Sequence, residues 1–219
     1  MQEIRKTADG SPTIYDSNFE ESLHSAFGSL TESRHIFIKH GLLHISKTRK
    51  TISILEIGYG SGLNAVLSYE AAKQNQLKIN YQGIEKHPPT TEIQTQFNTA
   101  LPIDIQATAN HFADVQWNKT TQVSNIFMIK KLQSDFLEYL PQQAFDLIYF
   151  DPFSPEKHPK AWSASFLKKI SDNHMKTGSL LLTYSSKGVV KQALRSAGLI
   201  VQRLEGPPGK RHILRAKKN

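Results

Sequence analysis

The spacing of hydrophobic and polar positions changes near residue 50, and this change divides the sequence into two parts. After Thr51, short apolar or β-branched runs alternate with stretches rich in Ala, Leu and Lys. This alternation is typical of βαβ units, in which helices connect parallel strands. We therefore predict a doubly wound α/β fold with a mostly parallel sheet over residues 51–219, preceded by an N-terminal extension over residues 1–50.

Seven segments after residue 50 have the length and the apolar composition of buried strands. The last two are joined only by the segment GPPGK, which is too short to hold a helix. We therefore expect these two strands to form an antiparallel hairpin at one edge of the sheet. The predicted strands are TISILEI (51–57), KINYQGIE (78–85), NIFMIK (125–130), FDLIYFD (145–151), GSLLLTY (178–184), LIVQRLE (199–205) and RHILRA (211–216).

Residues with helical spacing lie between most of these strands. In the extension, a turn at residues 9–12 precedes a predicted helix over residues 19–30. The polar stretch 101–124 is longer than a usual connection, and we predict one more strand within it, near residues 114–117, without assigning it a role. The other predicted helices are 63–75, 90–99, 136–140, 161–174 and 188–197, the last with Gly198 as its C-terminal cap.

Composition and charge narrow the range of functions. The absence of cysteine excludes disulfides, thiolate nucleophiles and cysteine-based metal sites, and we expect no metal. No apolar run is long enough to cross a bilayer and no secretory signal is visible, so we expect a cytoplasmic protein with no membrane partner. The net charge of +8 favours a polyanionic partner, although basic residues also serve solubility.

The first predicted strand leads into EIGYGSGLN, a glycine-rich turn. Glycine lets a backbone approach a ligand closely, and Gly58, Gly60 and Gly62 stand at this turn. Dinucleotide-binding turns have the spacing G-x-G-x-x-G, whereas here the third glycine comes one residue early. The spacing disfavours NAD and suits S-adenosylmethionine, which has no pyrophosphate. We assign Glu56 and Asn64, at the two ends of the turn, to the same cofactor site.

Two further segments complete the predicted cofactor site. Glu85 ends the second strand, at the distance where an acid accepts hydrogen bonds from ribose hydroxyls in folds of this kind. Asp135 and Phe136 follow the third strand, where an adenine ring would lie, and Asp135 can accept from the adenine amino group. An exposed loop carboxylate and a helix-capping aspartate are the ordinary alternatives for Glu85 and Asp135.

The fourth predicted strand ends in Asp151, Pro152 and Phe153, beside the topological switch point of the sheet. This sequence resembles the D-P-P-Y motif of amine methyltransferases, in which the carboxylate and a following carbonyl accept the hydrogens of an amino group. Methyl transfer is an in-line displacement, so the enzyme contributes mainly positioning and support for the charge that develops on nitrogen. We assign the three residues as catalytic, with Asp151 orienting the amine and accepting its proton. The alternative is a turn that merely ends the strand.

Motifs along most of the chain resemble one bacterial family. The match is to the methyltransferase half of the tRNA 5-methylaminomethyl-2-thiouridine biosynthesis bifunctional protein (MnmC family), and it runs from about Glu20 to the end of the sequence. Asp151, Phe153, Pro155, Pro159 and Trp162 fit that family's pattern D-[GP]-F-x-P-x-x-x-P-x-x-W. The other matching segments are SRHIFIKHGL, LEIGYGSGLN, IEKHP, GSLLLTYSSKGVVKQALRSAGL and GPPGKRHILRA.

The resemblance implies a fold, a reaction and a partner. The fold is that of Rossmann-like class I methyltransferases, with a seven-stranded sheet and the extension packed over the cofactor. The reaction is methyl transfer from S-adenosylmethionine to the exocyclic amine of 5-aminomethyl-2-thiouridine at the wobble position, which makes the tRNA anticodon loop the partner. The flavin-dependent oxidase half has no counterpart here, so we expect any such oxidase to act upstream on a separate chain. The expected substrate-binding residues are His24, Glu32, His158, Trp162, Tyr184, Lys210 and Arg211.

Three other functions are open at this point. An N-methyltransferase of a small-molecule or protein amine would keep every cofactor residue. A non-catalytic RNA-binding module would have no need of Gly58, Gly60, Glu85 and Asp151. A dehydrogenase is disfavoured by the glycine spacing.

Overall fold

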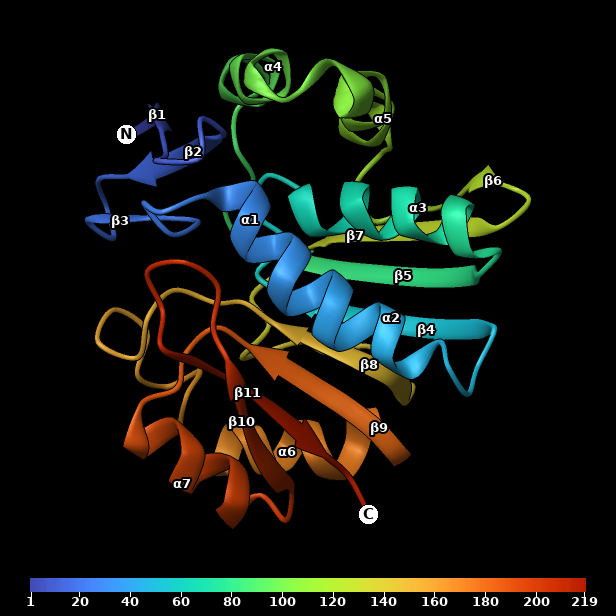
Figure 1. Ribbon diagram of the computed structural model, residues 1–219, viewed down its shortest axis with the longest axis vertical. Coiled ribbons are helices and arrows are strands. Elements are labelled where there is room, and N and C mark those ends of the chain that lie inside the picture. Colours follow the sequence, from blue (N-terminus) through green and yellow to red (C-terminus); the bar gives the residue numbers. More distant parts are fainter.

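A computed structural model describes residues 1–219 and shows a central eight-stranded sheet with helices on both faces (Figure 1). The strand order is β10-β11-β9-β8-β4-β5-β7-β6. The five central strands run parallel, while β6, β10 and β11 pair antiparallel with their neighbours. The strands are β4 (Thr51–Ile57), β5 (Lys78–Glu85), β6 (Thr120–Ser124), β7 (Phe127–Gln133), β8 (Phe145–Phe150), β9 (Met175–Thr183), β10 (Ile200–Glu205) and β11 (His212–Lys217).

The predicted doubly wound α/β fold is confirmed, and so is the antiparallel hairpin of the last two strands. The expected count of seven strands is wrong by one, because β6 pairs with β7 at the far edge. The extra strand predicted near residues 114–117 lies instead at β6. Asp114 ends the helix α5 (Ile103–Asp114), whose buried Ile105, Ala109 and Phe112 recur at helical spacing.

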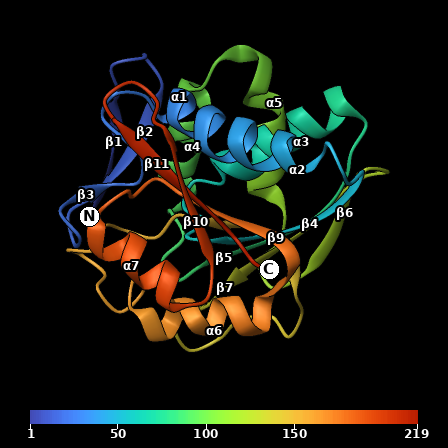
Figure 2. The same ribbon diagram turned by 60° about the horizontal axis from the view of Figure 1, so that its bottom comes forward.

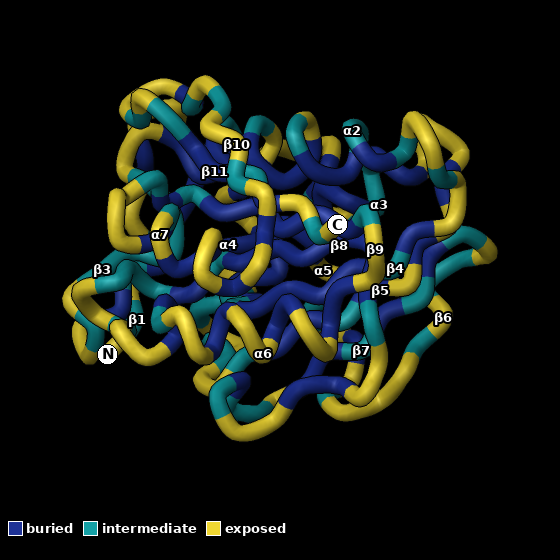
Figure 3. Tube along the Cα trace, turned by 90° about the horizontal axis from the view of Figure 1, so that it is seen from below, coloured by how far each residue is buried: buried dark blue, intermediate teal, exposed yellow.

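The strands contribute side chains to two hydrophobic cores, one on each face of the sheet. In β4, Ile54 packs into the core shared with α3 (Leu63–Asn75) and α5, whereas Leu55 packs with α6 (Ala164–His174) and α7 (Gly188–Ser196). Figure 2 shows α6 and α7 on one side of the sheet and α3, α4 (Thr91–Ala100) and α5 on the other. The buried positions are concentrated in the strands between these layers (Figure 3). No helix has the length and hydrophobicity needed to span a bilayer.

Four of the helices predicted after residue 50 are present, and one prediction is wrong. Residues 136–138 form a turn, so no helix separates β7 from β8. The carbonyl oxygen of Asp135 accepts from the N–H of Glu138 and of Tyr139, which makes a single helical turn, and Pro141 soon after it cannot continue a helix. The segment therefore returns to the sheet without a helix. Gly198 ends α7 with φ +80°, as its predicted capping role requires.

The N-terminal extension contains strands where a helix was predicted. β1 (Gln2–Lys6), β2 (Pro12–Asp16) and β3 (Glu21–Ser22) form a small antiparallel sheet, and the predicted turn at residues 9–12 connects the first two. The helix predicted over residues 19–30 is wrong, because these residues include β3 and irregular segments. They cross from the small sheet to the main domain, and this path is set by tertiary contacts rather than by local spacing.

A continuous helical segment follows the small sheet and crosses the face of the main sheet that α3 also covers (Figure 1). It consists of α1 (Ser29–Ser33), the π-helical η1 (Arg34–Leu42) and α2 (Leu43–Ile45). The Asp9 side chain accepts hydrogen bonds from the N–H and hydroxyl of Thr31, at 3.0 and 2.7 Å, and so ties the β1–β2 turn to the first helical turn. Ile36, Phe37 and Leu42 are buried, which anchors the extension to the core.

Gly83 in β5 is required by a buried aromatic ring. A Cβ at this position would overlap Cδ2 of Tyr59 and lie 3.0 Å from the Cγ atom of the same ring. Because the surrounding core is closely packed, the ring cannot move without disturbing its neighbours. We expect Gly83→Ala to lower the free energy of unfolding by about 2 kcal/mol, measured by urea denaturation.

Gly188, the first residue of α7, provides the matched control. No atom lies within 4 Å of the position of its added Cβ, so Gly188→Ala should leave the stability unchanged or raise it slightly. Equal stabilities for the two variants would contradict the packing role of Gly83.

Candidate active site

A cavity of about 390 Å³ opens at the carboxyl ends of the parallel strands. This is where ligands bind in open α/β sheets, at the point where the strand order reverses. In this sheet the reversal lies between β4 and β8. The loops after β4, β5, β7, β8 and β9 all contribute lining residues, and the small N-terminal sheet closes the opposite side. The cavity therefore combines residues from nearly every part of the chain.

The glycine turn after β4 forms one wall of the cavity. Gly58 has φ +88°, and a Cβ there would lie 2.5 Å from the carbonyl oxygen of Asp151. Gly60 has φ +53°, and its N–H donates to the Glu85 carboxylate at 3.0 Å. Both glycines line the cavity, as the sequence predicts. The turn thus joins the end of β5 to the end of β8 through backbone contacts that only glycine permits.

Gly62 does not line the cavity, and its assignment to the cofactor site stays a prediction. A Cβ at Gly62 would lie 2.7 Å from the hydroxyl oxygen of Tyr59, so this glycine makes room for the tyrosine. Tyr59 itself reaches the cavity wall and packs edge-on against Trp117, with ring centroids 5.7 Å apart. Sequence reasoning missed Tyr59, and the aromatic residue between two glycines was the signal that could have identified it.

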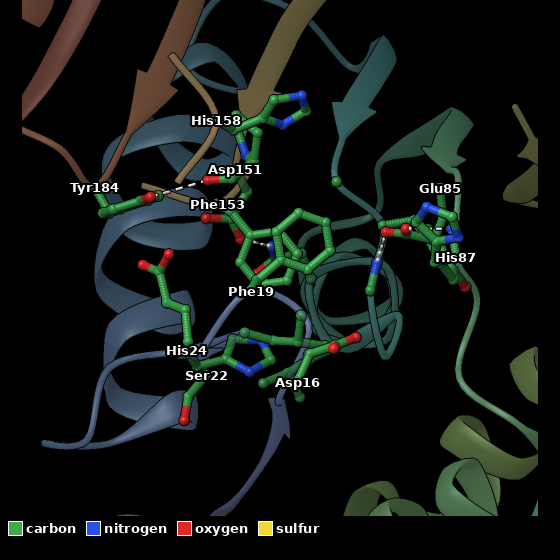
Figure 4. A pocket seen from close by; sticks show the side chains of 18 of the residues that line it. Asp16, Phe19, Ser22, His24, Glu85, His87, Asp151, Phe153, His158 and Tyr184 are labelled. Atoms are coloured by element: carbon green, nitrogen blue, oxygen red, sulfur yellow. Dashed lines mark hydrogen bonds between the residues drawn. The ribbon is translucent and has the colours of Figure 1, made fainter. Parts of the chain in front are cut away.

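Glu85 lies on the opposite side of the cavity from Asp151 (Figure 4). Its two carboxylate oxygens accept hydrogen bonds from the N–H of Gly60 at 3.0 Å and of His87 at 2.8 Å. These bonds fix the carboxylate in one orientation. Each oxygen keeps a further lone pair, which is the capacity that binding of two ribose hydroxyls requires.

Asp135 and Phe136, which the sequence analysis assigned to the adenine site, line the same cavity. The Asp135 carboxylate accepts from the N–H of Leu137 and pairs with Lys86 Nζ at 2.8 Å. The ring of Phe136 packs against that of His158, with centroids 5.2 Å apart. Burial lowers the pKa of His158, so this ring is a neutral partner for a flat ligand.

A hydrogen-bonded chain of polar side chains supports Asp151. The Asn64 amide donates to Glu56 at 2.8 Å and to Asp151 at 3.1 Å, and the Tyr81 hydroxyl donates to Glu56 at 2.7 Å. Burial raises the pKa of Asp151 well above its usual value, and the nearby Glu32 and Glu56 raise it further. Glu56 is fully buried and does not line the cavity, and its assignment to the cofactor site stays a prediction.

The segment after β8 is held by two aromatic side chains. The Tyr184 hydroxyl donates to the Pro152 carbonyl oxygen at 2.9 Å, and the Trp162 indole N–H donates to the Phe153 carbonyl oxygen at 2.8 Å. Trp162 is buried beside Tyr184, where it supports the segment after β8. It does not line the cavity, and its expected substrate contact stays a prediction. Pro152, Phe153 and Tyr184 do line the cavity.

The N-terminal segment supplies the remaining wall, as the family resemblance implied for His24 and Glu32. Glu32 accepts from the Ser25 N–H at 2.7 Å and pairs with Lys210 Nζ at 2.8 Å. Burial lowers the pKa of His24 to about 4, so the ring is neutral at pH 7. Phe19, which sequence reasoning missed, stacks on Phe153 at a centroid distance of 4.1 Å. Arg211 is exposed and lies outside the cavity, and its expected contact with the substrate stays a prediction.

Comparison with known proteins adds the family. The family model described as S-adenosyl-L-methionine-dependent methyltransferase matches residues 102–219. The chain belongs to this family. The crystal structure of MNMC2 from Aquifex aeolicus is similar with a TM-score of 0.85 and 26% sequence identity, over 99% of this chain and 70% of that one. The predicted class I methyltransferase fold is thereby confirmed.

Curated relatives carry the name that the sequence motifs suggested. Two are called tRNA 5-methylaminomethyl-2-thiouridine biosynthesis bifunctional protein MnmC, from Burkholderia multivorans (27% identical over 92% of this chain) and Aromatoleum aromaticum (29% over 96%). The similarity to the methyltransferase half of the MnmC family is therefore confirmed. The chain spans about a third of the length of these relatives, 33% and 34% respectively.

The residues of this methyltransferase fit S-adenosylmethionine on the evidence of its own polar groups. Asn64 Oδ1 is a buried acceptor without a partner, and such an atom is costly unless a ligand satisfies it. The same wall holds Gly60 and Glu85, and the aromatic Phe136 lies beside Asp135. These residues would hold the amino-acid, ribose and adenine parts of the donor. No cluster of three or more potential metal ligands occurs in the chain.

The cavity is acidic although the chain as a whole carries a net charge of +8. Six carboxylates line the cavity, against two lysines, each of which is paired with one of them. A cavity of this charge attracts cations, and both a sulfonium donor and an alkylammonium acceptor are cations. The lining carboxylates are Asp16, Glu21, Glu32, Glu85, Asp135 and Asp151.

Glu56 makes the stability of this methyltransferase depend on pH. Burial raises the pKa of Glu56 to about 8, so the folded state binds a proton that the unfolded state releases above about pH 4.5. The free energy of unfolding should therefore fall as the pH rises from 4.5 to 8, by up to about 1.4 kcal/mol per pH unit from this group alone. Glu56→Gln should be increasingly stable relative to the wild type across this window, as measured by urea denaturation at several pH values.

Outside the window the two proteins should differ by a constant amount. Glutamine keeps the shape of the side chain and can still bond to Asn64 and Tyr81. The difference in stability between the two proteins therefore reports the titration of Glu56. A stability difference that does not change between pH 5 and 8 would mean that Glu56 titrates normally in the folded protein.

Proposed function

We propose that this methyltransferase transfers a methyl group from S-adenosylmethionine to the exocyclic amine of 5-aminomethyl-2-thiouridine at the wobble position of cytoplasmic tRNA. The observation that carries the proposal is the Asp151 carboxyl group, half-buried at the end of β8 and across the cavity from Glu85. The names of the curated relatives support the choice of substrate. In this proposal residues 51–219 are the methyltransferase domain and residues 1–50 cover its cofactor site.

Asp151 acts as the proton acceptor. The acceptor amine reaches the cavity mostly as an ammonium ion, which has no lone pair. Burial raises the pKa of Asp151 and would lower that of the bound ammonium, so both shifts favour a neutral amine beside a neutral carboxyl group. Transfer of the proton to Asp151 then exposes the nitrogen lone pair. Asn64 keeps the Asp151 carboxyl group oriented during this exchange.

The neighbouring groups position the amine. S-adenosylmethionine, when bound, supplies a methyl group on a sulfonium sulfur. The Pro152 carbonyl oxygen accepts from Tyr184 and has a second lone pair for an amine hydrogen. Phe153 and Phe19 are stacked beside this position and exclude water from it. The displacement requires the nitrogen to approach the methyl carbon in line, and these residues would position the amine for that approach, which is the main source of rate acceleration.

A tRNA anticodon loop suits the cavity and the charge of the chain. Its bases are single-stranded, so one of them can enter a cavity without the cost of breaking a duplex. The excess of basic residues outside an acidic cavity separates the two tasks of binding phosphates and binding an amine. The proposed partner is therefore RNA rather than a free amine.

Asp151→Asn tests the proton-acceptor role. The variant keeps the size of the side chain but cannot accept a proton, so we expect kcat for methylation to fall by about 10² to 10⁴-fold. The dissociation constant for S-adenosylmethionine should change by less than about threefold, because Asp151 lies away from Glu85. Initial rates with radiolabelled donor and calorimetry measure the two quantities.

Glu85→Ala is the complementary variant. It removes the expected ribose contact, so it should weaken S-adenosylmethionine binding by about tenfold or more while leaving Asp151 intact. If Asp151→Asn weakened donor binding as much as it slowed the reaction, Asp151 would belong to the cofactor site and the mechanism would be wrong.

Wobble nucleosides test the substrate. In a strain without this gene, mass spectrometry of digested tRNA should show 5-aminomethyl-2-thiouridine in place of its methylated form. A plasmid copy of the wild-type gene should restore the methyl group, and a copy encoding Asp151→Asn should not. An unchanged nucleoside profile, together with methylation of a small-molecule or protein amine by the purified enzyme, would refute the proposed substrate.

A further inference from the structure

Lys210 carries an ammonium group into the wall of the cavity beside Asp151. Its Nζ atom lies 2.8 Å from Glu32 Oε1 and 4.4 Å from the centre of the Tyr184 ring. Glu32, Asp151, Tyr184 and Lys210 all line the cavity, and Figure 4 shows Tyr184 and Asp151 on the same side of it. An alkylammonium group is therefore already held between a carboxylate and an aromatic face.

These surroundings require a cation. The Glu32 side chain is only 9% exposed, and its second oxygen is fixed by the Ser25 N–H at 2.7 Å. A buried carboxylate is strongly destabilising unless a positive charge lies beside it. Asp151 lies within the electrostatic reach of the same ammonium group: burial and Glu32 raise its pKa, and Lys210 lowers it. Removing the Lys210 ammonium without a replacement would leave two carboxyl groups facing an empty space.

The head group of lysine is chemically the same as that of the proposed acceptor. Both are primary ammonium groups at the end of a methylene, and both are recognised by carboxylates and by the face of an aromatic ring. We propose that Glu32, Tyr184 and Asp151 form a subsite for the alkylammonium group of the acceptor, and that Lys210 Nζ occupies this subsite when no acceptor is bound. The inference rests on the proposed function, since it requires that the acceptor be an amine.

Lys210 can leave the subsite without a change in the fold. It lies in the loop between β10 and β11, which reaches the side of α1 in both Figure 1 and Figure 2. Its ammonium group has one ion-pair partner, Glu32, and the side chain has a long flexible stem. Rotation of this stem is sufficient to release the subsite. The acceptor ammonium then takes over both the ion pair and the aromatic contact, so Glu32 stays paired until the amine gives its proton to Asp151.

The subsite explains how a cavity for a cationic donor can also select its acceptor. A nucleoside with a neutral methyl group in place of aminomethyl cannot replace Lys210, because Glu32 would lose its cation. Binding of the correct acceptor is weakened only by the fraction of time that Lys210 occupies the subsite. The lysine thus excludes neutral uridines at a modest cost in affinity for the amine.

Nucleoside binding tests the subsite directly. The probes are 5-aminomethyluridine and 5-methyluridine, titrated by NMR against the protein saturated with S-adenosylhomocysteine. We expect Lys210→Met to bind 5-aminomethyluridine about tenfold more tightly than the wild type, which corresponds to a subsite occupied nine-tenths of the time. Its affinity for 5-methyluridine should not decrease. Glu32→Gln should weaken binding of the amine nucleoside by about tenfold and leave the methyl nucleoside unchanged.

Two control variants separate the subsite from general charge effects. Lys187→Met removes an equal charge from a lysine that pairs with Glu156 at the protein surface, and Lys210→Arg keeps a positive charge on the same loop. Neither should tighten binding of the amine nucleoside. A weaker affinity of Lys210→Met for 5-aminomethyluridine would overturn the proposal, because Lys210 would then contact the acceptor. Equal tightening of S-adenosylmethionine, which is also a cation, would overturn it by showing a general field effect.

The outcome is distinguishable from that of the proposed function. If tRNA is not methylated but Lys210→Met still gains affinity for the amine nucleoside, the RNA substrate is wrong and the subsite stands. If tRNA is methylated but Lys210→Met binds both nucleosides as the wild type does, the reaction is right and the subsite is refuted.

Discussion

The close approach of two strand ends is the constraint on which the site depends. Gly58 lies so near to the Asp151 carbonyl oxygen that any side chain at residue 58 would collide with it. Gly60 then directs its N–H to Glu85. Because β5, β4 and β8 are adjacent in the sheet, these contacts bring Glu85 and Asp151 to opposite sides of one cavity. In the proposed reaction the distance between donor and acceptor would thus be set by backbone geometry rather than by flexible side chains.

A second constraint is the cost of burying negative charge. Asp151 is supported by Asn64, and Asn64 in turn by Glu56, so an acidic chain of hydrogen bonds runs from the cavity into the core. Burial raises the pKa of both acids. Burial of these two acids lowers the stability of the folded protein whenever they are charged. Such costly groups are typical of sites that must receive a proton or a cation. Glu56, which the sequence analysis assigned to the cofactor site, belongs to this chain of hydrogen bonds and lies behind the residues that line the cavity.

The sequence was most informative where residues are local to a strand end. The turn after β4, Glu85, Asp135 and Asp151 could all be placed because a parallel sheet brings the carboxyl ends of its strands together. It was least informative where side chains from distant segments meet. Tyr59 fills the space above Gly62 and Gly83, and Trp162 bonds to the backbone of Phe153. Neither contact follows from spacing, so the sequence could not show that Gly62 makes room for Tyr59 or that Trp162 holds the segment after β8.

The structure of the N-terminal extension could not be predicted from local spacing either, yet this segment supplies one side of the cavity. Its polar and apolar residues follow no single period, since β3 and the crossing to α1 are shaped by contacts with the domain they cover. Once folded, the extension places Phe19 on Phe153 and Glu32 beside Lys210. A Rossmann-like sheet alone would present Asp151 at an open edge, where water would stabilise both the carboxylate and an ammonium ion. In the proposed reaction, enclosure by the extension would exclude that water, and the resulting shift toward neutral partners would allow an amine to act as a nucleophile near neutral pH.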